Sequence, residues 1–146
     1  KILTIKNNYS EAISALRKAK ELAPDEEKKR EIQYEIARAQ FTQGSYTAAY
    51  NTALSVTGEH RGNALIIAGK SVGQNANNCG SSTFERKCNN IYAVQLLQQG
   101  RSLGASDGGA IGSYTNKFPT PSECFDNGSP SSITLTCYGV TVTPCN

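Results

Sequence analysis

Residues 8–58 read NYSEAISALRKAKELAPDEEKKREIQYEIARAQFTQGSYTAAYNTALSVTG, and one pattern occurs twice in this stretch. Tyr9 and Ala12 of the first occurrence return as Tyr46 and Ala49, at an offset of 37 residues. A period between about 20 and 50 residues is typical of stacked helical hairpins. The stretch therefore predicts a repeat protein built from pairs of helices.

The helices can be placed from caps and apolar spacing. Asn8 is a suitable N-cap, and Glu11 stands three residues later, as in a capping box. The apolar residues that follow are spaced as on one helix face: Ala12, Ile13, Leu16, Ala19 and Leu22. Pro24 ends this helix, Asp25 caps the next, and Gly44 ends that one. We expect helices over residues 9–23, 26–43, 46–57, 61–74 and 83–103.

The first seven residues precede the cap at Asn8. Aligned on the repeat, they correspond to the final turns of a helix whose beginning is missing, so that the first hairpin is incomplete. The alternative is a short strand, because Ile2 and Ile5 belong to a β-prone run. We prefer the helix.

Gly44, Tyr46 and Ala49, preceded by Phe41, resemble the tetratricopeptide repeat. Gln33 and Gln40 depart from the resemblance, because large aromatic residues usually stand at these positions. The resemblance implies a short α-solenoid of about two and a half helical hairpins. It also implies protein–protein contacts.

In that family the first helix of each hairpin lines a concave groove. The equivalent positions here form a series of cations with polar neighbours: Lys1, Arg38 and Lys70, flanked by Tyr34 and Gln74. Such a groove would bind an acidic peptide, a chain carboxylate or an anionic glycan. The alternative is a set of long basic side chains that solvate the helix surface.

The composition narrows the class of protein. The chain has 146 residues, enough for one domain or for one domain and a small appendage. The net charge of +3, with 18% charged residues, does not favour nucleic-acid binding. We expect no membrane span, because no apolar run is long enough, and no cofactor or metal.

Five cysteines lie in the second half of the chain, at Cys79, Cys88, Cys124, Cys137 and Cys145. Their spacing matches neither zinc nor redox motifs. We therefore expect an exported protein of the cell envelope or the extracellular space, with disulfides. Since five is odd, at least one thiol is free or pairs between chains. A local Cys79–Cys88 bridge could fasten the long loop before residue 83 to the following helix.

Composition changes after residue 104. We expect residues 1–104 to form the helical domain and residues 105–146 a Ser/Thr/Gly-rich segment. Residues 104–112 read as a linker or a poor helix, and the Phe118–Pro121 stretch as extended backbone. Alternating apolar and polar residues predict a β-hairpin over 132–143, with Tyr138 and Gly139 as a two-residue turn.

Several motifs of this region resemble the C-terminal part of bacterial envelope-associated tetratricopeptide proteins: Cys79-Gly80, Tyr92-Ala93-Val94, Ser113-Tyr114, Phe118-Pro119 and Cys137-Tyr138. This resemblance implies a Cys79–Cys137 disulfide, the alternative to Cys79–Cys88. It implies no catalytic activity.

Two N-glycosylation sequons begin at Asn8 and Asn127, so a glycan is a candidate modification, with Asn127 the better acceptor. His60 is the only histidine, and no nucleophile motif accompanies it. We therefore expect no enzyme. The sequence favours an exported structural or assembly protein that contacts other chains, above all copies of itself, as the repeating subunit of an extracellular filament. The alternative is an envelope adaptor that binds a peptide or anionic ligand in the groove.

Overall fold

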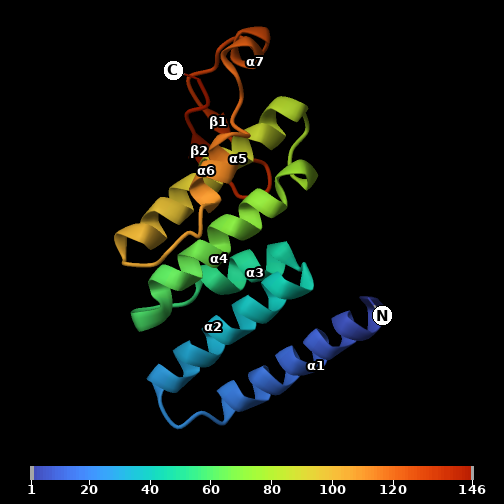
Figure 1. Ribbon diagram of the computed structural model, residues 1–146, viewed down its shortest axis with the longest axis vertical. Coiled ribbons are helices and arrows are strands. Elements are labelled where there is room, and N and C mark those ends of the chain that lie inside the picture. The colour runs from blue at the N-terminus through green and yellow to red at the C-terminus, as the bar shows by residue number, and fades with distance from the viewer. Residues whose placement is uncertain (1, 146) are drawn as a thin grey trace.

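A computed structural model describes residues 2–145, with the side chains of residues 8–145. Its helices follow one another along the long axis of the molecule (Figure 1). The main helices are α1 (Ile2–Glu21), α2 (Glu26–Gln43), α3 (Tyr46–Leu54), α4 (Arg61–Gln74) and α5 (Thr83–Ser102). Short 3-10 turns, η1 (Gly58–His60) and η2 (Ala76–Asn78), flank α4. Each main helix packs on the next, so the predicted stack of helical hairpins is confirmed.

Local signals explain most of the boundaries. Asp25 accepts a hydrogen bond from Lys28 N at 2.7 Å, and Ser82 caps α5 through Glu85 N. Gly44 adopts the left-handed conformation after α2, with φ 88°. α3 ends at Leu54, before the expected residue 57.

The expectation that Asn8 caps a helix was wrong. α1 runs without interruption from Ile2 to Glu21, so Asn8 lies inside the helix and the strand alternative for Ile2–Ile5 is also excluded. One long helix satisfies its internal N–H groups through its own carbonyls, which leaves the Asn8 side chain no capping role.

Two further helices lie in the C-terminal segment, for which we expected a linker or a poor helix over residues 104–112. α6 (Ala110–Thr115) follows the glycine-rich turns and packs on α5, and α7 (Pro121–Asp126) follows the Phe118–Pro119 turn. Thr120 and Glu123 form a capping box with Pro121 at the first helical position. Thr120 itself has extended backbone, as expected, but the prediction missed the helix after it.

The β-hairpin is confirmed, but its register differs from the predicted one. β1 (Ile133–Thr134) pairs antiparallel with β2 (Thr141–Val142), and Ile133 lies opposite Val142. Leu135 N donates to Val140 O at 2.8 Å, so four residues, Thr136 to Gly139, connect the strands. The predicted two-residue turn was therefore wrong, although the shift by two positions keeps each side chain on its face.

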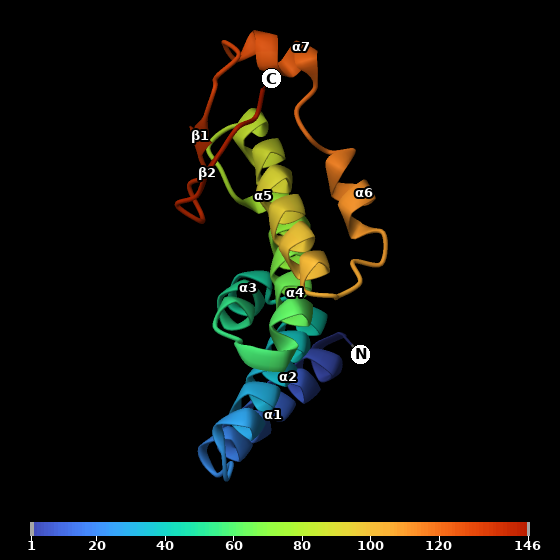
Figure 2. The same ribbon diagram turned by 90° about the vertical axis from the view of Figure 1, so that its left-hand side faces the viewer.

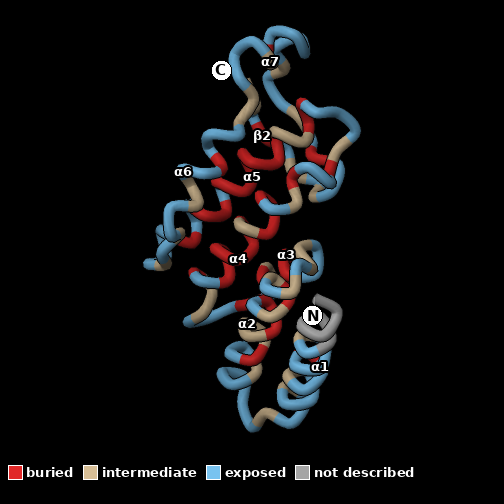
Figure 3. Tube along the Cα trace, turned by 45° about the vertical axis from the view of Figure 1, so that its right-hand side comes forward, coloured by how far each residue is buried: buried red, intermediate tan, exposed pale blue. Residues whose placement is uncertain are grey.

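The core has two unequal parts. The larger runs through α3, α4 and α5 and reaches α6 and the hairpin (Figure 3). The smaller consists of Ile13, Ile32 and Ile36, between α1 and α2. Residues 8–21 of α1 are mostly exposed, as Figure 3 shows.

Two disulfides join the C-terminal segment. Cys79 pairs with Cys137, with Cα atoms 5.7 Å apart, and Cys124 pairs with Cys145 at 5.9 Å. The Cys79–Cys88 alternative was therefore wrong: Cys88 is the free thiol and lies fully buried in α5. Burial raises the pKa of the Cys88 thiol to about 11.

Candidate functional site

Three of the predicted groove residues line a recess of about 240 Å³ between α2 and α4. Tyr34 and Arg38 come from α2 and Lys70 from α4, so the structure brings these three together. The recess also contains residues that the sequence analysis did not identify, among them Asn63 and Ser106. Ser106 could not have been predicted, because the path of the glycine-rich segment after α5 depends on long-range packing.

The positive charge of this recess comes mainly from Lys70. Arg38 Nη1 lies 3.2 Å from both carboxylate oxygens of Glu35, which offsets its charge, and its guanidinium lies 5.8 Å from the centre of the Tyr34 ring. Tyr34 in turn stacks on His60, with ring centres 5.0 Å apart. Lys70 forms no ion pair with any residue whose side chain is described.

The other two predicted groove residues are not part of this recess. Lys1 lies outside the described residues. Gln74 is placed further along α4, where its Nε2 donates to the hydroxyl of Tyr114 at 2.9 Å. Gln74 therefore helps to hold α6 on the stack, and it does not line the recess.

A second groove opens on the other side of α2, and we call it the α1–α3 groove. α1 and α3 both pack on α2, and side chains from the two helices form the walls of the groove. Three adjoining hollows of about 290, 510 and 390 Å³ make up the groove. The floor is one face of α2, at helical spacing: Lys29, Gln33, Ile36, Gln40 and Gln43.

The walls of the α1–α3 groove are polar. α1 contributes Ser10, Ser14 and Arg17, and α3 with its flanking residues contributes Ser45, Thr52 and Ser55. Basic residues gather toward one end: Arg17, Lys20, Lys29 and Arg30, against the acids Glu21 and Glu26.

Hydrogen bonds link the walls across the floor. Lys20 Nζ donates to Gln33 Oε1 at 2.8 Å, and Gln33 Nε2 donates to Ser55 Oγ at 2.8 Å. Gln43 Nε2 donates to Ser10 Oγ at 2.9 Å. Gln40 is different: its side chain is buried, and its Oε1 accepts no hydrogen bond. A buried acceptor without a partner is uncommon in folded proteins.

The sequence contained one signal for the α1–α3 groove. Gln33 and Gln40, the two departures from the repeat resemblance, both lie on its floor.

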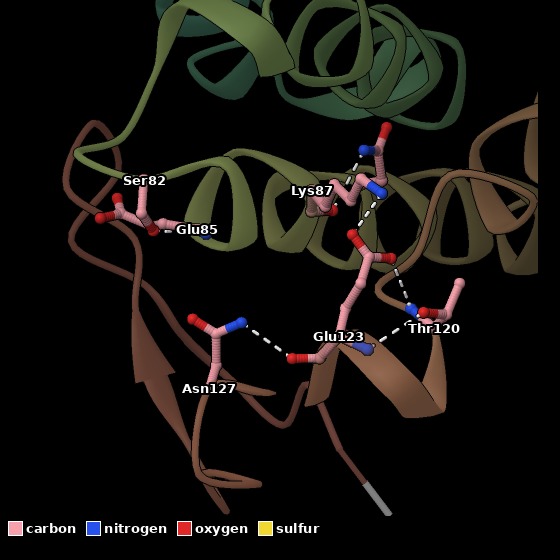
Figure 4. Close-up of polar contacts among 7 residues, drawn as sticks. Ser82, Glu85, Lys87, Thr120, Glu123 and Asn127 are labelled. Carbon is pink, nitrogen blue, oxygen red and sulfur yellow. Dashed lines mark hydrogen bonds and ion pairs between the residues drawn. The ribbon is translucent and has the colours of Figure 1, made fainter. Parts of the chain in front are cut away.

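The two sequons lie in different settings. Asn8 is exposed inside α1, and Asn127 is exposed just after α7. The Asn127 amide nitrogen donates to the carbonyl oxygen of Glu123 at 2.8 Å (Figure 4). A glycan on Asn127 would thus project from the end of the molecule.

The described residues also bear on metal binding and on membrane insertion. No group of three or more His, Cys, Asp or Glu side chains in this part of the chain is placed to hold a metal ion. Within residues 2–145, no helix combines the length and apolar character needed to cross a membrane.

Comparison with known proteins gives no relative. No protein family, curated protein or solved structure matches this chain.

Proposed function

We propose that this chain is a non-catalytic assembly protein that associates with copies of itself through its helical end. The observation that carries the proposal is an uncovered apolar stripe on α1. Ala12, Ala15 and Ala19 are exposed at helical spacing, and Leu22, which continues the stripe, is 83% exposed.

The stripe is unusual because of where it lies in the stack. Helices in a repeat stack bury their apolar surface against neighbours on both sides. α2 covers the opposite face of α1, where Ile13 is buried, and the described residues do not cover the Ala12–Leu22 stripe. Covering it would gain about 25 cal/mol for each Å² of apolar surface. A second copy of the chain meets this requirement.

We also propose that the chain is exported, and the cysteines support this. Two disulfides fit a protein that works in an oxidising compartment, such as the cell envelope or the extracellular space. Because a contact between two different ends of a molecule does not close upon itself, repeated association of this kind gives a filament unless it forms a ring.

The test is light scattering and electron microscopy over a wide range of protein concentration. We expect particles that grow with concentration, and we expect Ala19→Glu to reduce this growth because it places a charge in the stripe. Thr47→Glu, at an exposed position on α3, is the matched control. Monomers at every concentration would contradict the proposal.

A second candidate function is an adaptor that binds an acidic peptide in the recess between α2 and α4. The observation in its favour is the shared position of Tyr34, Arg38 and Lys70. Since Lys70 is the cation without an acidic partner among the described side chains, Lys70→Glu should abolish binding of a poly-glutamate peptide, measured by fluorescence anisotropy. Lys18→Glu, outside the recess, controls for net charge, and equal loss in both variants would refute a specific site.

A further inference from the structure

We propose that the α1–α3 groove receives the tip of α7 from a second copy of the chain, with Phe125 beside Ala48 and Asp126 against Arg17. This inference rests on the proposed self-association and adds a second pair of surfaces, separate from the Ala12–Leu22 stripe.

The tip of α7 has the properties of a docking element. Phe125 is 79% exposed, although aromatic side chains of its size usually bury about 150–250 Å². Asp126 beside it is exposed and forms no ion pair with a described side chain.

The tip is also held in place. Glu123 of α7 forms an ion pair with Lys87 of α5 and caps its own helix through Thr120 (Figure 4). Cys124, next to Phe125, is joined to Cys145. Binding would therefore cost little conformational entropy, because the element is already ordered.

The α1–α3 groove offers complementary groups. Ala48 is exposed and gives apolar surface in the hollow that Arg17 also lines, whereas Ile13 and Ile36 beneath it are buried. Arg17 lies where two of the hollows meet and has no acidic partner among the described side chains. Gln40 Oε1, buried and without a donor, lies beneath the same hollow.

The charge and chemistry of the groove favour a protein segment over other polymers. Its lining has four basic and two acidic residues. Residues 105–145 have the opposite balance, with Asp107, Glu123 and Asp126 against Lys117. No aromatic side chain lines any of the three hollows, so the groove lacks the stacking surface that nucleic-acid bases use.

The two surfaces lie at opposite ends of the molecule, as Figure 1 and Figure 2 show. α7 therefore cannot reach the groove of its own chain. A contact between the two ends of different copies is heterologous, so each copy can bind one neighbour at each end.

A charge exchange tests the contact. Arg17→Glu and Asp126→Arg should each raise the concentration at which assembly is half complete by about ten-fold, as measured by light scattering. The double variant should restore assembly toward the native value, because the pair is re-formed with reversed charges. Phe125→Ala should also weaken assembly, and adding it to either charge variant should not restore assembly.

The control is Lys18→Glu, which changes the net charge as Arg17→Glu does but lies outside the groove lining. Circular dichroism of each variant verifies that the helices are retained. The contact would be refuted if both single variants assembled at the same concentration as the native chain, or if the double variant did not restore assembly. Self-association itself would still stand. A native chain that stays monomeric would instead refute the proposed function.

Discussion

Glu85 is the residue that connects the C-terminal hairpin to the helical stack by hydrogen bonds. Its carboxylate accepts from Thr136 N at 2.9 Å and from the backbone and hydroxyl of Ser81. Burial alone would raise the pKa of Glu85, but the hydrogen bonds from Thr136 and Ser81 outweigh it, so the pKa lies below its usual value of 4.5.

Stability should therefore depend on the ionised form of Glu85. The contribution is fully present above pH 4.5, the ordinary value, and is lost as the pH falls through the lower pKa of the folded protein. Glu85→Gln should lower the free energy of unfolding by about 1–3 kcal/mol, because the amide turns a donor toward groups that need an acceptor. Thermal unfolding between pH 2 and 7 measures this.

Glu59→Gln, at an exposed position in η1, is the control for the loss of one charge. Amide exchange at Thr136 gives a local measurement: it should become faster in Glu85→Gln and remain unchanged in the control. An identical pH profile for Glu85→Gln and the native chain would contradict the role given to this carboxylate.

At the scale of elements, the crossing of α4 and α5 depends on glycine. A Cβ at Gly69 would lie 2.8 Å from Leu97 Cγ and 2.9 Å from the Ala93 carbonyl oxygen, so the two helices cross too closely here for a side chain. The backbone oxygen cannot move away without displacing α5.

Gly69→Ala should therefore destabilise the fold by about 1–3 kcal/mol, because overpacking outweighs the better helix propensity of alanine. Chemical denaturation gives the free energy. Gly112→Ala on α6 is the matched control, because nothing lies within 4 Å of its added Cβ, and it should be neutral or slightly stabilising. Equal effects of the two substitutions would refute the packing argument.

The elements that could be predicted from sequence are those specified by nearby residues. α2 begins at Asp25 and ends at Gly44 because cap and terminator lie next to it in the chain. The hairpin register could not be predicted, since it depends on contacts with distant residues. Glu85 binds Thr136 N, Cys79 is joined to Cys137, and the Tyr138 ring lies 4.9 Å from that of Tyr50.

The candidate site, too, could be predicted only in part from the sequence. The sequence could predict that Tyr34, Arg38 and Lys70 lie close together, because the repeat relates equivalent positions on α2 and α4. The sequence did not predict the α1–α3 groove, because its two walls and its floor come from three different helices. Its polar residues also resemble an ordinary solvated surface.

At the scale of the whole molecule, the two ends differ in how they are held together. The α7 end carries both disulfides and an ion pair between Lys87 and Glu123. The α1 end rests on the small cluster of Ile13, Ile32 and Ile36, and among the described residues no disulfide joins α1 to the rest of the stack.

That small cluster determines how a chain of such molecules would bear tension. If copies are joined as proposed, a pulling force enters each one at its covalently bridged end and leaves through the walls of the α1–α3 groove. The separation of α1 from α2 breaks the packing around three isoleucines and the Lys20–Gln33 and Gln43–Ser10 hydrogen bonds, so we expect this hairpin to open before the larger core or the bridged segment. The first hairpin would then act as a reversible extensible element: it would open and lengthen the filament under load, and it would refold when the load is removed.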